Sequence, residues 1–166
     1  MPSKRKGVLK MKKININNEL TLSYNEPFNI MTAGELKTYC GTAVNHWGIM
    51  DKENHCLFIV SWTKPGLLSF LTDPKSILKN AERCMKRNLR AFDREDSFMI
   101  NVGGKEAVGI RFTYTANDAD IRQIGETSAL RVNKKVYVIQ YVSRLDGDDR
   151  NRAAYHEILK SVRANA

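Results

Sequence analysis

The fold of this chain is decided by residues 98–142, which read FMINVGGKEAVGIRFTYT over 98–115 and IRQIGETSALRVNKKVYVIQYV over 121–142. Alternating apolar and polar residues are typical of β-strands, and Gly103-Gly104 and Asn133-Lys134 are typical of hairpin turns. We therefore expect strands over 98–102, 107–115, 121–132 and 136–142, paired in chain order as an antiparallel meander.

The burial expected of each strand follows from its pattern. Residues 136–142 and Cys56–Trp62 are apolar on both alternating faces, which is typical of central strands covered on each side. In 107–115 the two faces differ, and one of them carries Val108, Ile110, Phe112 and Tyr114. Shorter signals predict a hairpin of 14–16 and 20–24 around Asn17-Asn18, and a strand over 43–50.

Three helices are predicted from their caps and their apolar periodicity. Thr32 and Glu35 form a capping box, with Met31 and Leu36 as its hydrophobic staple, for a helix over 33–40. Asp73-Pro74 begins a helix over 74–91, and a last helix covers 149–163. The core-facing residues are Ile77, Leu78, Ala81, Cys84, Met85, Leu89 and Phe92 in the second helix, and Ala154, Tyr155, Ile158, Leu159 and Val162 in the third.

These elements predict one α+β domain. Because two strands need cover on both faces and two long amphipathic helices are available, we expect an α/β/α sandwich in which one mainly antiparallel sheet is covered by helices on both faces. The domain is expected over 14–166, and no linker or internal repeat interrupts it. Residues 1–13 are expected to form a basic, disordered tail.

Three segments resemble the PsbP-like superfamily. They are Gly104-Lys105-Glu106-Ala107 at the start of a strand, the strand Val136–Tyr141, and the terminal helix that ends at Tyr155–Ser161. The superfamily includes PsbP, a Ran-binding nuclear import factor and DcrB-like bacterial proteins. The resemblance covers residues 14–163 and implies a small α/β/α sandwich, a binding or assembly role and no catalytic site. No photosystem-specific feature is present, and the sequence lacks the signal peptide of the exported members.

Composition and charge narrow the function classes. The chain has 166 residues, of which 42% are hydrophobic, so fully disordered and low-complexity classes are excluded. No apolar run is long enough for a transmembrane helix, and the basic start is not followed by the apolar region of a secretory signal. The net charge of the chain is +9. Six of the basic residues lie in residues 1–13, and this segment contains no acidic residue. Such a tail is either simply solvated or able to bind nucleic acid or an anionic membrane.

The cysteines indicate a reducing compartment. Cys40, Cys56 and Cys84 are odd in number and lie in or near apolar patterns, so we interpret them as reduced, buried thiols. The sequence contains no Asn-x-Ser/Thr acceptor. Both observations predict a cytoplasmic location, in a bacterium if the DcrB-like resemblance holds.

No pattern predicts catalysis, a cofactor or a metal. His46, His55 and His156 lie outside any nucleophile motif, and pairing Cys40 with His46 is no more specific than any scattered pair. Cys40, His46, His55 and Cys56 lack the paired spacing of zinc sites. Asp146-Gly147-Asp148-Asp149 fits a turn and a helix N-terminus better than a calcium loop, and no phosphate-binding loop is present.

Two features are candidate partner-binding elements. The connection before the second helix carries Leu67, Leu68, Phe70 and Leu71, which suit either a lid on the core or an apolar docking patch. The outer side of that helix carries Lys75, Lys79, Arg83, Lys86, Arg87 and Arg90. This basic face is either solvated, or a contact for an acidic protein or for nucleic acid. The sequence thus predicts a non-enzymatic protein-binding, assembly or chaperone-like module, with an electrostatic nucleic-acid binder as the alternative.

Overall fold

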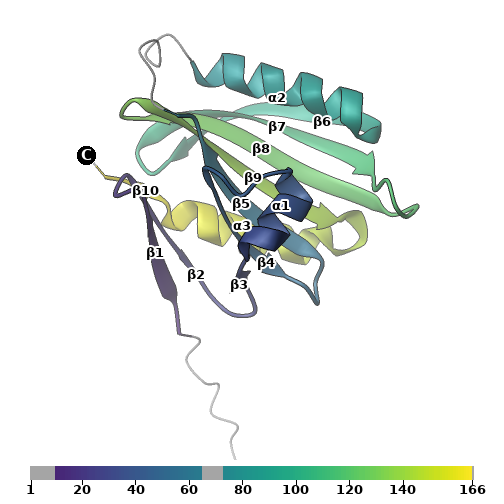
Figure 1. Cartoon of the computed structure of the whole chain (residues 1–166), viewed down its shortest axis with the longest axis horizontal. Helices are drawn as coiled ribbons and strands as arrows, with labels where there is room; N and C mark the ends of the chain where they lie inside the picture. The colour runs from purple at the N-terminus through teal and green to yellow at the C-terminus, as the bar shows by residue number, and fades with distance from the viewer. Residues whose placement is uncertain (1–9, 65–72, 166) are drawn as a thin grey trace, which may run out of the picture.

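The computed structural model describes residues 10–64 and 73–165, and these form an α+β fold with three helices (Figure 1). In chain order the helices are α1 (Ala33–Cys40), α2 (Pro74–Asn88) and α3 (Asp148–Ser161). The strands are β1 (Lys12–Ile16), β2 (Leu20–Tyr24), β3 (Asn29–Ile30), β4 (His46–Asp51), β5 (Cys56–Trp62), β6 (Arg90–Val102), β7 (Lys105–Thr115), β8 (Arg122–Val132), β9 (Lys135–Arg144) and β10 (Arg163–Ala164). A 3-10 turn, Leu145–Gly147, precedes α3.

The main sheet has seven strands in the order β3-β4-β5-β9-β8-β7-β6, and every neighbouring pair is antiparallel. The predicted meander is confirmed as β6 to β9, and β5 lies between β4 and β9 as a central strand. Hairpins dominate because the chain offers tight turns, among them Gly103-Gly104 with positive φ at both residues. A second sheet, β1-β2-β10, uses the predicted N-terminal hairpin.

α1 and α2 pack against the same face of the main sheet. Leu78 of α2 is buried against Ile110 and Phe112 of β7 and Ala129 of β8. Leu36 of α1 is buried at the other end of this face. Its cluster is Met31, Leu36, Met50 and Ile59, with Cys40, Ala43 and Leu57 packed against it. The two helices therefore use separate apolar clusters of one sheet surface.

α3 and the small sheet cover the alternate residues of the same strands. Phe58 and Val60 of β5 and Tyr137 and Ile139 of β9 belong to a cluster with Tyr155 of α3. The Tyr141 and Tyr155 rings stack with centroids 4.7 Å apart. Tyr155, Ile158 and Leu159 are buried as their helical spacing predicts. Val162 is buried too, but the predicted end of this helix at residue 163 is wrong, because α3 ends at Ser161 and Arg163 begins β10.

The predicted end of the second helix is wrong. α2 ends at Asn88 rather than at residue 91, and Arg90 is the first residue of β6. Leu89 is extended and Ala91 has a φ of 51°, so the chain turns sharply and pairs with β7. Phe92 still reaches the core, but it does so from β6, where its ring stacks on Phe112 at 5.4 Å.

Two further expectations differ from the structure. Cys84 was predicted to be buried but is exposed, because its side of α2 borders an open groove rather than the sheet. β1 begins at Lys12, two residues inside the range expected for the basic tail. None of the helices in 10–64 and 73–165 combines the length and apolar character that a membrane span requires.

Candidate functional site

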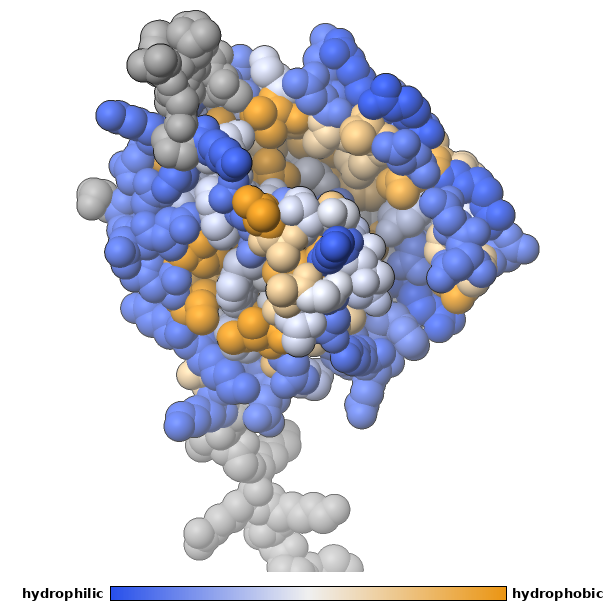
Figure 2. All heavy atoms as spheres, in the orientation of Figure 1, coloured by the Kyte–Doolittle hydropathy of each residue, from blue (hydrophilic) through white to orange (hydrophobic). Residues whose placement is uncertain are grey.

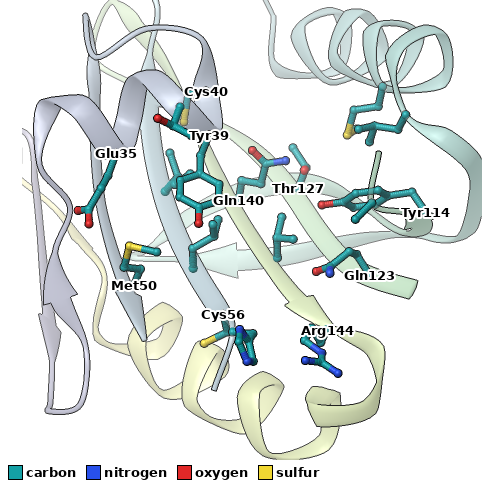
Figure 3. Close-up of a pocket in the computed structure, with 18 of the residues that line it drawn as sticks. Glu35, Tyr39, Cys40, Met50, Cys56, Tyr114, Gln123, Thr127, Gln140 and Arg144 are labelled. Carbon is teal, nitrogen blue, oxygen red and sulfur yellow. The ribbon is translucent and has the colours of Figure 1, made fainter. Parts of the chain in front are cut away.

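A groove of about 1330 Å³ lies on the main sheet between α1 and α2. Its floor is formed by β5, β8 and β9, one side by α1 and the other by α2 (Figure 3). In the space-filling view the surface is hollowed between these helices, and the side chains beneath α2 that border the hollow are hydrophobic (Figure 2). The groove exists because an eight-residue α1 and a fifteen-residue α2 leave the middle of the sheet face uncovered.

Polar and apolar positions alternate along the groove floor. Thr127 of β8 pairs with Gln140 of β9, and two residues further along Gly125 pairs with Val142. The next pair on this face is Gln123 with Arg144. Because paired residues of antiparallel strands share a face, the floor presents a polar, an apolar and then a polar row. In Figure 3 the side chains of Gln140 and Thr127 lie together between the helices, with Gln123 and Arg144 further along.

The uncharged polar side chains of this floor, Thr127, Gln123 and Gln140, have no hydrogen-bond partner among the described residues. Thr127 is 2% exposed, and its Oγ1 is buried and unpaired. Gln123 and Gln140 are half-buried, and neither amide forms a hydrogen bond within the described part of the chain. A buried polar group without a partner costs about 1–3 kcal/mol, so such groups are rare in native cores. The floor therefore offers hydrogen-bonding capacity that the fold itself does not use.

The α2 side of the groove is largely apolar. Ala81, Met85 and Leu89 line it, and Phe112 and Tyr114 of β7 continue the apolar surface below them. Burial raises the pKa of the Tyr114 phenol to about 12, so this hydroxyl stays neutral at physiological pH. The groove thus combines apolar sides with uncharged hydrogen-bonding groups on its floor.

Among the charged residues that line the groove, Glu35, Lys52 and Arg144 form ion pairs, whereas Asp51 and Asp118 form none within the described part of the chain. Lys52 Nζ is 2.7 Å from Glu35 Oε1, and this hydrogen bond, with that from the Thr32 backbone, lowers the pKa of the Glu35 carboxyl. Arg144 Nη2 is 2.8 Å from Asp146 Oδ2. These pairs leave the centre of the floor free of net charge.

The predicted apolar patch Leu67, Leu68, Phe70 and Leu71 lies outside the described residues. The predicted basic face is partly neutralised. Arg90 is not on the helix and pairs with Asp120 at 2.5 Å, and Lys86 pairs with Glu82 at 3.3 Å. Arg83 donates to Asn80 Oδ1 at 3.5 Å.

Besides Arg83, three cations of the basic face keep no carboxylate within ion-pair distance in the described part of the chain. They are Lys75, Lys79 and Arg87, and all three are exposed. Within 10–64 and 73–165 no group of three or more His, Cys, Asp or Glu residues is placed to hold a metal ion.

The sequence interpretation missed the groove. The usable signal was Gln140, a large polar residue inside a strand interpreted as apolar on both faces. Gln123 and Gln140 are the only glutamines in the chain, and both lie on the groove floor. A covered strand would carry aliphatic residues there, so these amides mark the part of the face that the helices leave open.

Comparison with known proteins supports the fold. No protein-family model matches the chain, and no curated protein matches it in sequence. CyanoP, the cyanobacterial PsbP of Synechocystis sp., has a similar structure, with a TM-score of 0.64 at 9% identity over 97% of this chain and 96% of that one. LpqN of Mycobacterium tuberculosis, which is involved in cell envelope biogenesis, gives a TM-score of 0.63 at 16% identity over 98% of this chain and 94% of that one.

A third similar structure is PA94 of Pseudomonas aeruginosa, a protein of unknown function described as a regulator by inference. It gives a TM-score of 0.55 at 11% identity and covers 91% of this chain and 94% of that one. At these identities the likeness concerns the fold alone. The chain has a PsbP-like fold, an α+β architecture built on a mainly antiparallel sheet.

Proposed function

We propose that the protein is a non-enzymatic binding module that holds a partner protein or peptide in the groove between α1 and α2. The observation that carries the proposal is the open floor of this groove, where Thr127, Gln123 and Gln140 hold unused hydrogen-bonding groups between apolar sides. Concave surfaces with apolar walls and a few polar groups are typical of binding sites.

The state of the thiols favours binding over covalent catalysis. Burial raises the pKa of Cys40, which borders the groove, and that of Cys56, which reaches about 12. A thiol becomes a nucleophile only as the thiolate, so neither group is activated at neutral pH. Three thiols without disulfide partners also suit the cytoplasm, which we propose as the location.

We further infer that the frame of the module is an α/β/α sandwich. Ile59 of β5 belongs to the α1 cluster, whereas its neighbours Phe58 and Val60 belong to the α3 cluster. In β9, Val136 packs in the α2 cluster and Tyr137 in the α3 cluster. A sheet held from both faces provides a rigid floor for a groove.

Photocrosslinking tests the proposal at the groove itself. Cys84 is exposed beside the groove and takes a benzophenone maleimide in a Cys40→Ser background. As a matched control, the same label is placed on Met11→Cys in a chain that also carries Cys40→Ser and Cys84→Ser. In extract of the source cells we expect a polypeptide adduct from Cys84 that is absent from position 11 and lost with Val142→Arg. Identical adducts from both positions, or none that Val142→Arg removes, would overturn the groove as the binding surface.

A second candidate function is electrostatic nucleic-acid binding through α2. It is favoured by Lys75, Lys79 and Arg87, which are exposed and lack ion pairs in the described part of the chain. Affinity for a DNA duplex should then fall with salt, with a logarithmic slope of about −0.9 for each phosphate contact. DNA binding should be abolished in a variant that combines Lys75→Glu, Lys79→Glu and Arg87→Glu. An affinity that depends neither on the salt concentration nor on these three substitutions would exclude this function.

A further inference from the structure

The spacing of the groove floor matches the repeat of an extended polypeptide. Polar rows stand at Gln140 and Arg144 of β9, with the apolar Val142 midway between them. Alternate residues of an extended chain lie about 6.6–6.8 Å apart, so a peptide laid along β9 keeps step with these rows. From Val138 to Arg144 the floor offers six residue steps, or about 20 Å at the rise of a strand. A segment of six or seven residues fits this length.

The unused groups of the floor require a ligand with both donors and acceptors. Each glutamine amide has an acceptor oxygen and two donor hydrogens, and a threonine hydroxyl serves in either sense. Thr127 and Gln140 are paired neighbours, and Gln123 lies two rows away on the same face. A ligand that buried these groups without bonding them would raise their cost rather than remove it.

This requirement separates two classes of apolar ligand. An acyl chain fills the space beneath Met85 and Leu89 but offers no partner to the amides. An extended peptide offers an N–H and a C=O at every residue, and its alternate side chains point to opposite sides. Because the centre of the floor carries no net charge, the bound residues are uncharged, since a buried unpaired charge is far more costly than a neutral group.

We propose that the groove binds an extended, uncharged peptide segment. Its main-chain amides face the floor and bond to Gln140, Gln123 and Thr127, and its side chains point to the two sides of the groove, where apolar ones pack on Met85 and Leu89 of the α2 side. This inference rests on the proposed function, because it names the ligand of the same groove. Recognition through main-chain groups is tolerant of side-chain identity, so segments of many sequences fit if they are extended and neutral.

The test begins with selection of a peptide ligand. Random dodecapeptides displayed on phage are selected on the immobilised full chain and counter-selected on Val142→Arg. The winning peptide is synthesised with a fluorophore, and its Kd is measured by fluorescence polarisation. Met99→Arg, at a side chain that is 61% exposed on β6, is the matched control for an added charge. Met85→Arg, from the α2 side, replaces Val142→Arg if thermal melting shows that the latter does not fold.

Three results are expected from the selected peptide. Its sequence should be uncharged over six or seven residues. Loss of one hydrogen bond should raise Kd about fivefold to tenfold in Gln140→Leu and in Thr127→Val. Two N-methylated versions of the peptide are compared, one modified at the odd-numbered nitrogens and one at the even-numbered nitrogens. Only one of them should show a Kd raised at least about tenfold, because only one set of N–H groups faces the floor. Met99→Arg should leave Kd unchanged.

The failures of the two proposals are distinguishable when sodium dodecanoate is titrated as the acyl probe. If dodecanoate binds in a manner blocked by Val142→Arg and no peptide is selected, the groove is a binding site but the peptide inference is overturned. Selected peptides that are charged, or that bind Gln140→Leu as tightly as the unmodified chain, also overturn it. If neither probe distinguishes Val142→Arg from Met99→Arg, both proposals fail.

Discussion

Thr127 and Thr113 face opposite sides of neighbouring strands and are both almost fully buried, yet their hydroxyls differ. Thr113 Oγ1 accepts a hydrogen bond from Arg122 Nη2 at 2.8 Å, whereas Thr127 Oγ1 has no partner in the described part of the chain. The free Thr127 hydroxyl is therefore a cost in the unliganded protein, and in the proposed complex it contacts the peptide. The comparison distinguishes a threonine hydroxyl that the fold uses from one that it leaves unpaired.

We expect Thr127→Val to leave the free energy of unfolding unchanged or to raise it by up to about 1 kcal/mol, because it removes an unsatisfied buried hydroxyl. Thr113→Val, the matched control, should lower it by about 1.5–3 kcal/mol, because it removes an acceptor for a charged donor. Urea denaturation monitored by tryptophan fluorescence measures both. Equal losses in the two variants would contradict the assignment of Thr127 to the groove.

A second residue-scale feature joins the N-terminal hairpin to the main sheet. The Glu19 carboxylate accepts hydrogen bonds from Tyr137 Oη, from Lys135 Nζ at 3.1 Å and from Asn133 Nδ2 at 3.4 Å. Burial acts to raise the pKa of Glu19, but these hydrogen bonds outweigh it and the pKa is lowered. The folded state therefore binds this proton less tightly than the unfolded state, whose pKa is near 4.5.

The stabilisation from Glu19 is complete above pH 4.5 and is lost as the pH falls through the lowered pKa of the folded state. We expect Glu19→Gln to reduce the free energy of unfolding by about 1–3 kcal/mol at pH 7. The difference from the unmodified chain should shrink as the pH falls below 4.5. Glu157→Gln, whose side chain is 75% exposed, is the control and should change little at any pH. A difference in the free energy of unfolding between Glu19→Gln and the unmodified chain that stays constant from pH 7 to pH 3 would refute this role of Glu19.

At the scale of elements, what the sequence revealed depended on how local the signal was. Thr32 caps α1 through Glu35 as the capping box predicts, and Gly41 ends the helix in the left-handed region. The end of α2 was not predictable in this way, because the apolar periodicity continues through Leu89 and Phe92 across the boundary. Pairing with β7 decides that boundary, and strand pairing is not encoded in one local window.

The turn between α2 and β6 carries a backbone cost that can be measured. Ala91 has a φ of 51°, and it lies next to a register shift between Arg90 and Asp93 in the β6–β7 pairing. A side chain with a Cβ is disfavoured there by about 1 kcal/mol relative to glycine. We expect Ala91→Gly to raise the free energy of unfolding by about 0.5–1 kcal/mol, as measured by urea denaturation.

The matched control for that change is Ala153→Gly, at an exposed position within α3. There glycine should lower the free energy of unfolding by about 0.5–1 kcal/mol, because helical backbone favours alanine. Opposite signs in the two variants would establish the left-handed turn as the true end of α2. A loss of stability in Ala91→Gly would show that the helix continues through residue 91.

At the scale of the whole molecule, the β6 to β9 meander and most of the core followed from sequence patterns, but the β5–β9 pairing, the separate small sheet and the groove did not. Gln123 and Gln140 are seventeen positions apart in sequence and come together only through the β8–β9 pairing. The opening above them depends on the lengths and positions of α1 and α2 relative to the sheet. Periodicity indicates which side of a strand is apolar, and it does not indicate where the covering helices stop.

If the groove is the binding surface, the bound peptide contacts both ends of its floor at the same time. A ligand long enough to contact Gln140 and Gln123 together spans the apolar row at Val142. Val142→Arg should therefore abolish binding of the selected peptide, with Kd raised more than about a hundredfold, since a long charged side chain would occupy the floor that the peptide main chain crosses and would be buried beneath it. Fluorescence polarisation measures this, and a tenfold effect or less would show that the peptide does not cross the row.

The most direct measurement uses the two glutamines as reporters. Because Gln123 and Gln140 are the only glutamines in the chain, side-chain ¹⁵N labelling of glutamine yields two amide pairs in an NMR spectrum. When the selected peptide is titrated, the chemical shifts of both amide pairs should change in proportion to the fraction of protein that is bound. Neither pair should change in the Val142→Arg chain. A peptide that binds while both amide pairs remain unmoved would contradict the groove as the site of recognition.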